Sequence, residues 1–171
     1  MNCMRNFIKI SAIMLICVTV LNSCVRQRYI SQNEFAQRFN SNSQETKLEV
    51  NDYYTKDNEF NFFAKSEAMR EIMITLTQNE EFYVTTAELT VIKDGKDLDE
   101  SEKEELLKTV VSMLSVIINC EESEVSAVLS EIGFDKDKFC FLNTTETFDI
   151  LKASCFFYSN SEMLSFQVKI K

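Results

Sequence analysis

The chain has 171 residues and a formal net charge of −9, with 45% hydrophobic and 26% charged residues. These values are typical of one globular domain that is large enough for a core, and they exclude wholesale disorder. Proline, histidine and tryptophan are absent and glycine occurs only twice, which excludes collagen-like and proline-rich architectures, glycine-rich phosphate loops and every site that needs an imidazole.

The first 23 residues have the three parts of a secretory signal. Residues 1–9 carry Arg5 and Lys9 without an acidic residue, and residues 10–21 are uncharged and mostly apolar. As a helix, this apolar stretch reaches about 18 Å, whereas the hydrocarbon core of a bilayer is roughly 30 Å thick. We therefore expect residues 1–23 to be an export signal rather than a membrane span.

The end of this segment, Leu21-Asn22-Ser23-Cys24, resembles the lipobox of bacterial lipoprotein precursors. The resemblance implies that Cys24 receives a diacylglyceryl group through a thioether bond and that lipoprotein signal peptidase cuts between Ser23 and Cys24. It also implies a protein on the extracytoplasmic face of a bacterial cell membrane, held by fatty acyl chains such as palmitate. Two acyl chains are enough for stable membrane residence. The alternative is an ordinary secretory leader, or an uncleaved anchor, with an unmodified Cys24.

Charge limits the partners of the mature chain. Removal of residues 1–23 takes away Arg5 and Lys9 and no acid, so the formal charge falls from −9 to −11. Phosphate backbones and anionic headgroups repel such a chain. We expect no nucleic-acid partner, and a bilayer contact that depends on the acylated cysteine. Residues 24–30 then form a lipidated tether, and residues 31–171 form a single domain.

The domain begins with two signals for a helix. Ser31 and Glu34 form a capping-box pair, which predicts a helix that starts at Gln32. Ile30 and Phe35 stand at the two positions of a hydrophobic staple, which supports the same start.

After a polar loop at residues 40–46, the sequence period changes from helical to alternating. Four runs place apolar residues at every second position, as half-buried strands do. Their apolar positions are Leu48 and Val50; Phe60, Phe62 and Ala64; Ile72, Ile74 and Leu76; and Phe82, Val84, Leu89 and Val91. The fourth run changes phase near Ala87, which predicts a β-bulge.

The second half of the chain predicts two helices and two strands. Asp99 and Glu102 form a capping pair ahead of a wide apolar stripe at residues 106–118, which predicts a buried helix. A shorter helix follows and ends at Gly133, and two alternating runs flank residues 159–161. The order α-ββββ-αα-ββ favours an α+β fold, in which helices cover one face of an antiparallel sheet of about six strands.

Three cysteines of the mature domain are not committed to lipid: Cys120, Cys140 and Cys155. One disulfide with a leftover thiol fits an extracytoplasmic location, and three small buried thiols fit the apolar neighbouring residues. We favour buried thiols, because no cysteine spacing matches a metal site or a redox motif. The acids of residues 94–100 fail the EF-hand spacing and are interpreted as a solvated helix start, so no metal or cofactor is expected.

One aromatic group is a candidate contact surface. Alternation sends Phe60 and Phe62 to one face of the sheet and Phe63 to the other. One of the nearby residues Tyr53 and Tyr54 is expected to share the face of Phe63. Because exposed aromatic clusters often mark interaction sites, Tyr53, Tyr54 and Phe63 form a candidate patch for a protein partner or a hydrophobic ligand. The alternative is that loops cover this second face.

These observations favour a membrane-anchored extracytoplasmic binding or interaction module without catalytic activity. The missing histidine removes Ser-His-Asp and Cys-His arrangements, and no acid or serine stands at a spacing specific to catalysis. The alternative function is a cell-surface hydrolase that uses a carboxylate pair. It needs two acids about 5 to 10 Å apart in a cleft, with the pKa of one of them raised.

Overall fold

The computed structural model describes residues 29–43, 46–49, 59–66, 69–140 and 143–171. In chain order, their elements are α2 (Gln32–Asn42), β1 (Lys47–Glu49), β2 (Glu59–Ser66), β3 (Met69–Gln78), β4 (Val84–Ile92), α3 (Glu100–Ile118), α4 (Glu122–Glu131), the 3₁₀ helix η1 (Lys136–Cys140), β5 (Thr144–Ile150), β6 (Ala153–Ser159) and β7 (Met163–Ile170). The expected α+β class is confirmed, with seven strands in place of about six. The predicted signal, its cleavage site and Cys24 lie outside the described residues.

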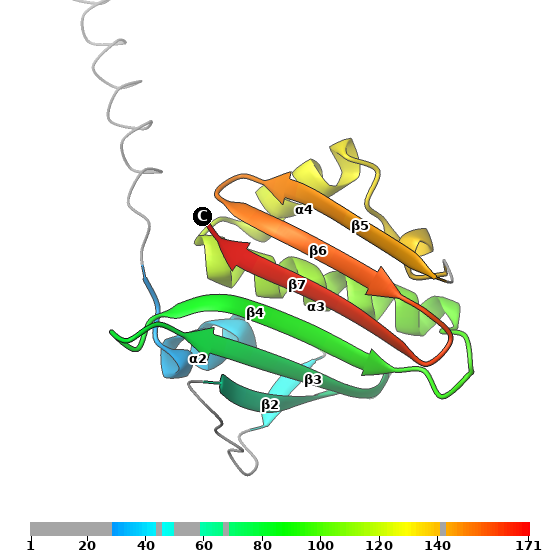
Figure 1. The fold of residues 1–171 in the computed structure, drawn as a ribbon, viewed down its shortest axis with the longest axis horizontal. Coiled ribbons are helices and arrows are strands. Elements are labelled where there is room, and N and C mark those ends of the chain that lie inside the picture. Colours follow the sequence, from blue (N-terminus) through cyan, green and yellow to red (C-terminus); the bar gives the residue numbers. More distant parts are fainter. Residues whose placement is uncertain (1–28, 44–45, 50–58, 67–68, 141–142) are drawn as a thin grey trace, which may run out of the picture.

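All seven strands form one antiparallel sheet, in the spatial order β1-β2-β3-β4-β7-β6-β5. Two meanders, β1 to β4 and β5 to β7, are joined where β4 pairs with β7. Figure 1 shows the helices together behind this sheet, with α3 running across its middle. The chain between the two meanders contains α3 and α4, so this connection supplies most of the helical layer.

The core lies between α3 and the helix-facing side of the sheet. α3 contacts β3, β4 and β7 and buries apolar side chains along most of its length. The strands present every second residue to it, and the buried Ile74, Leu89 and Phe166 are paired across three neighbouring strands. Removal of apolar area from water contributes about 25 cal/mol per Å², which makes this contact the dominant stabilising one.

A cluster of phenylalanines extends the core beneath α4. The Phe134 ring lies edge-on to the rings of Phe139, Phe157 and Phe166, with centroid distances of 5.8, 5.5 and 5.4 Å. Gly133 directly precedes it with φ +71°, as expected of the residue that ends a helix. The cluster therefore fixes where the chain leaves α4 and returns to the sheet.

Both predicted helix starts are confirmed. The Ser31 side chain accepts a hydrogen bond from the Glu34 N–H at 3.3 Å. Asp99 and Glu102 form a reciprocal capping box, with distances of 2.9 and 3.0 Å. Because each cap satisfies backbone N–H groups that have no partner inside the helix, these short signals fix the first residue of α2 and of α3.

The first helix is longer than the sequence pattern predicts. α2 continues through residues 40–42, which belong to the polar segment expected to be a loop. The Asn40 side chain explains the extension, because its amide donates to the Leu48 carbonyl at 3.1 Å and accepts from the Leu48 N–H at 2.7 Å. These two bonds hold the last turn of α2 against β1.

A bulge in β4 is confirmed, but it lies between Val84 and Thr86 rather than near Ala87. Phe82, which was expected in the same strand, is exposed in the turn that precedes it. Val84 and Ala87 are both buried although they are three positions apart. Thr77 of β3 pairs with Thr86 and Gln78 pairs with Val84, so Thr85 is the extra residue of the bulge on β4. It allows Val84 and the alternating residues after Ala87 to face the same core.

The strand that sequence patterning missed is β5. It is an edge strand, and its apolar positions are only Phe148 and Ile150. A two-residue turn of Leu151 and Lys152 joins it to β6, without the glycine, asparagine or aspartate that usually marks such a turn. β5 and β6 were therefore expected to be one run.

Candidate functional site

The sheet has a second face, opposite the helices, which no described helix covers (Figure 1). Cross-strand pairing arranges its side chains in rows. One row runs from β2 to β6 through Phe63, Met73, Thr90, Ser165 and Tyr158. Apolar and hydroxyl side chains share this row, and each of them is at least partly buried. We call this helix-free side of the sheet the open face.

The open face is hollowed over β2, β3 and β4. A groove of about 570 Å³ lies there, and we call it the open-face groove. Its apolar lining residues are Phe63, Met73 and Ile92, its charged ones are Glu71, Lys93, Asp94, Lys96 and Glu102, and Thr90 completes the set. The groove is concave and has an apolar part, as ligand-binding sites do. Five of its nine lining residues are charged, and one of these, Glu102, comes from the first turn of α3 at the edge of the groove.

The structure tests part of the predicted aromatic patch. Phe63 lies on the open face and lines the groove, whereas Phe62 is buried on the helix side. Tyr53 and Tyr54 lie outside the described residues. Sequence reasoning missed Met73 and Ile92, although alternation placed both opposite the buried positions of their strands. Alternation within one strand does not give the register between strands, and it is this register that places Met73 opposite Phe63 and Thr90.

A second aromatic area lies further along the open face, on β6. Phe156 is exposed and Tyr158 is half-buried. Between them and the groove, the Glu88 carboxylate accepts hydrogen bonds from Ser165 Oγ at 2.7 Å and Gln167 Nε2 at 3.5 Å. Because this polar network lies on β4 and β7, the open face has two apolar areas rather than one continuous patch.

The loop after β4 forms one side of the open-face groove. Its backbone is fixed to the β6–β7 turn, because the Lys93 N–H donates to the Glu162 carbonyl at 2.7 Å and the Gly95 N–H to the Ser161 carbonyl at 3.1 Å. The Lys93 side chain is 1% exposed, and its Nζ donates to Ser159 Oγ at 3.4 Å. A lysine and a serine together can form a nucleophile and its base. Ser159 is completely buried, however, so this pair is structural.

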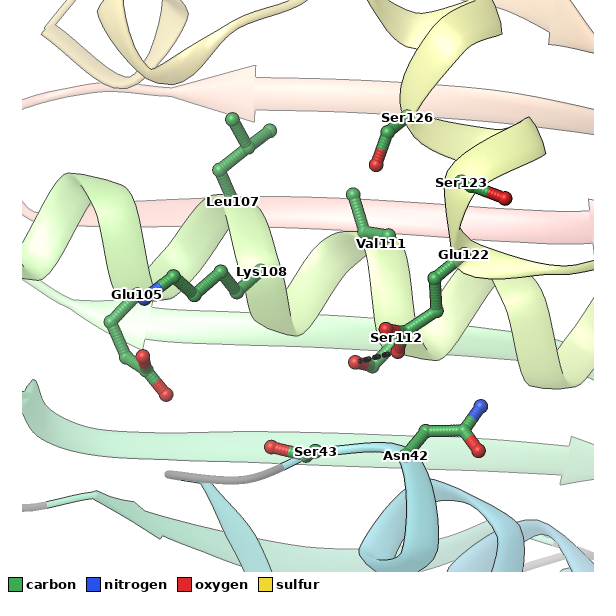
Figure 2. A pocket seen from close by; sticks show the side chains of 10 residues that line it. All are labelled: Asn42, Ser43, Glu105, Leu107, Lys108, Val111, Ser112, Glu122, Ser123 and Ser126. Atoms are coloured by element: carbon green, nitrogen blue, oxygen red, sulfur yellow. Dashed lines mark hydrogen bonds between the residues drawn. The ribbon is translucent and has the colours of Figure 1, made fainter.

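A separate, polar groove of about 390 Å³ lies between the end of α2, the middle of α3 and the start of α4 (Figure 2). Its lining residues are Asn42, Ser43, Glu105, Leu107, Lys108, Val111, Ser112, Glu122, Ser123 and Ser126. The carboxylate of the buried Glu105 accepts a hydrogen bond from Thr46 Oγ1, and Glu122 Oε1 accepts one from Ser112 Oγ at 2.5 Å. Two carboxylates therefore line one groove.

This polar groove is where a carboxylate-pair hydrolase would have its acids. Figure 2 shows Glu105 at one end and the Ser112–Glu122 pair at the other. Glu105 and Ser112 are two helical turns apart, or about 10 Å along α3, which is at the wide limit for such pairs. The hydrolase alternative stays a prediction, with Glu105 and Glu122 as its candidate residues.

Glu100, one of the acids expected at the start of α3, forms two ion pairs. Lys103 and Lys136 lie 2.6 and 3.0 Å from the Glu100 carboxylate, and their hydrogen bonds lower its pKa to about 2. The pKa of Lys103 is raised by the Glu100 bond and by a hydrogen bond with the Cys140 thiol. This surface cluster ties η1 to the first turn of α3.

The expectation of three buried thiols is wrong for two of the three cysteines. Cys155 lies in the core, and burial raises the pKa of its thiol to about 12. Cys120 is half-buried and Cys140 is exposed, and these three cysteines form no disulfide with one another. Cys140 ends the short helix η1, whose buried position is taken by Phe139. Apolar neighbours in the sequence therefore did not determine which thiols enter the core.

Comparison with protein-family models, curated proteins and solved structures finds no match. Within the described parts of the chain, no helix is both long and apolar enough to cross a bilayer. The same residues contain no group of three or more His, Cys, Asp or Glu side chains that could hold a metal ion.

The ion pairs of Glu100 predict how the stability of the fold depends on pH. Because the pKa of Glu100 lies below the usual 4.5, its ion pairs stabilise the fold fully above pH 4.5 and lose this effect as the pH falls toward about 2. NMR titration of the Glu100 carboxyl group should give a midpoint near 2 in the wild type. Lys103→Met should raise the midpoint, whereas Lys108→Met should leave it unchanged, because Lys108 pairs with Glu104. A wild-type midpoint at the usual value would contradict the ion pairs.

Proposed function

We propose that the chain is a lipoprotein tethered to the extracytoplasmic face of a bacterial membrane, and that it binds a protein partner or a hydrophobic ligand without catalysis. The observation that carries the binding role is the meeting of Phe63, Met73 and Ile92 in one groove on the helix-free face of the sheet. The lipobox-like end of the leader at Cys24 supports the anchor.

The start of the described domain supports a short tether. Ile30 is fully buried, and its carbonyl accepts a hydrogen bond from the Val84 N–H at 2.9 Å. This hydrogen bond attaches the chain at Ile30 to the start of β4. Cys24 precedes Ile30 by six residues, which reach about 20 Å when fully extended. An acylated Cys24 therefore holds the domain close to the bilayer.

The open-face groove lies at the end of the sheet that is remote from this tether. β4 begins at Val84, beside Ile30, and ends at Ile92, in the groove. Its eight residue steps correspond to about 27 Å of strand. The groove is thus directed away from the acylated end, which leaves it accessible to a partner in the surrounding medium.

The anchor is tested by the Cys24→Ala variant. We expect the wild-type chain to lose residues 1–23, gain the mass of a diacylglyceryl group and incorporate an alkynyl palmitate analogue during growth. Cys24→Ala should retain the leader and incorporate none of the analogue, because the thioether needs the sulfur atom. Cys120→Ala, which removes a different thiol, is the matched control and should be labelled like the wild type. Equal mass and labelling of wild type and Cys24→Ala would remove the anchor.

Binding at the groove is tested by photo-crosslinking in intact cells. With p-benzoylphenylalanine in place of Ile92, illumination should give a defined adduct that the same group in place of Thr77, on the open face outside the groove, does not give. Adding Met73→Glu should reduce the adduct about tenfold, because a charge among apolar side chains weakens apolar binding by at least about 1.4 kcal/mol. The binding role would fail if both positions gave the same products.

A further inference from the structure

We propose that the end of the domain nearest Cys24 is a membrane-contact surface, where Tyr29, Phe82 and Leu151 enter the interfacial region of the bilayer. The inference rests on the proposed lipid anchor and deepens it. It gives the domain a fixed orientation at the membrane, rather than attachment by a tether alone.

The three side chains lie at one end of the sheet. The cross-strand row of Thr77, Thr86, Lys169, Ser154 and Asp149 runs just inside the β3–β4 and β5–β6 turns. Figure 1 shows both turns at the end where the chain enters the domain at residue 29. We call this end of the sheet the tether end.

The tether end has three exposed large hydrophobic side chains. Phe82 in the β3–β4 turn is 70% exposed, Tyr29 is 51% exposed, and Leu151 in the β5–β6 turn is 44% exposed. They make up half of the large hydrophobic side chains that are exposed among the described residues. Single exposed apolar residues are common on proteins, but several at one end mark a contact surface.

Two of these exposed side chains belong to residues whose backbone conformation is strained. Phe82 has φ 64° and Leu151 has φ 52°, a region that bulky side chains rarely adopt. The other non-glycine residues with positive φ in the described segments are aspartate or asparagine, which tolerate it: Asp94, Asn119 and Asn143. Strain that persists at an apolar, solvent-facing position is a reason to expect a function there.

The β3–β4 turn holds Phe82 outward by a set of hydrogen bonds. Asn79 Oδ1 accepts from the N–H groups of Glu81 and Tyr83, at 3.1 and 2.9 Å, and the Asn79 carbonyl accepts from the Phe82 N–H at 3.0 Å. The Tyr83 ring packs against that of Tyr29, with centroids 5.3 Å apart. Aromatic side chains of this kind are enriched where proteins meet the headgroup region of a membrane.

The length of the tether selects the bilayer as the occupant of this surface. Tyr29 follows Cys24 by five residues, so its Cα lies within about 17 Å of the acylated Cα. The polar region of each leaflet is itself several ångströms deep. A surface this close to an inserted acyl chain is at the membrane, and its apolar side chains have lipid to enter.

Charge favours apolar insertion over attraction to anionic lipid. The charged residues at the tether end are mostly acidic, because Arg38, Glu121, Glu122 and Glu124 lie around Leu151 and Lys152. The cations are Arg38, Lys152, Lys169 and Lys171, and the acids are Glu59, Glu80, Glu81, Glu121, Glu122, Glu124 and Asp149. Lys171 and Asp149 pair with each other at 2.7 Å. Because the whole chain is acidic, the contact is expected on zwitterionic phosphatidylcholine, without any need for anionic lipid.

The absence of tryptophan from the chain allows a direct test. Phe82→Trp places a reporter at the tether end. Ile132→Trp, at the C-terminal end of α4, is the matched control because Ile132 is also exposed and does not line the open-face groove. Each full chain, with its lipid confirmed by intact mass, is reconstituted into phosphatidylcholine vesicles with and without brominated acyl chains. We expect bromine to quench Phe82→Trp about twofold, since interfacial side chains lie about 5–10 Å into the headgroup and acyl boundary, and to leave Ile132→Trp unchanged. Leu151→Trp reports on the same surface if Phe82→Trp disturbs its turn.

The outcomes separate this inference from the anchor. If the mass shows the lipid but bromine quenches neither Phe82→Trp nor Leu151→Trp, or quenches Ile132→Trp equally, the membrane contact is overturned and the anchor stands. If Phe82→Trp is shielded from aqueous acrylamide but not quenched by bromine, a protein covers this end instead, which also overturns the proposal. A chain without the lipid mass contradicts the proposed function, and the inference falls with it.

Discussion

The packing of α3 across β3, β4 and β7 buries one face of the sheet and leaves the other without a described helix. A seven-stranded antiparallel sheet with helices on one side must carry two kinds of residue on alternate positions. On the helix side these are Ile74, Leu89 and Phe166, and on the open face they are hydroxyl, amide and scattered apolar side chains. Phe63 and Met73 are apolar although they lie on the open face, outside the core between the sheet and the helices, and both line the open-face groove.

The same sheet separates the proposed binding groove from the proposed anchor. Its strands separate the point where the chain enters, at Ile30, from the groove at Ile92. The short distance to Cys24 places Tyr29 and Phe82 beside the proposed lipid. The proposed anchor at one end and the groove at the other suit a protein that presents a binding site to the medium. Because the domain is acidic, the proposed attachment depends on acyl chains and apolar contacts.

The local signals of the sequence predicted much of the fold, because each has a short-range cause. The Asp99–Glu102 box and the Ser31 cap depend on hydrogen bonds within one turn, and alternation within a strand assigns Phe62 and Phe63 to opposite faces. The sequence did not predict β5 for two reasons. An edge strand needs few apolar residues, and Leu151 occupies a turn position where glycine is the usual residue. The groove and the tether end depend on which residues the register brings together, and no single strand contains that information.

The accessibility of the open face is tested most directly by comparing the oxidation of two methionines. Met73 lines the open-face groove, and Met113 is completely buried on α3. Brief oxidation of the native full chain by hydroxyl radicals, followed by mass analysis of its peptides, compares the two thioethers under identical conditions. We predict rapid oxidation of Met73 and protection of Met113 until the chain is unfolded. Equal protection of both residues in the native chain would mean that the second face of the sheet is covered, and it would contradict the account.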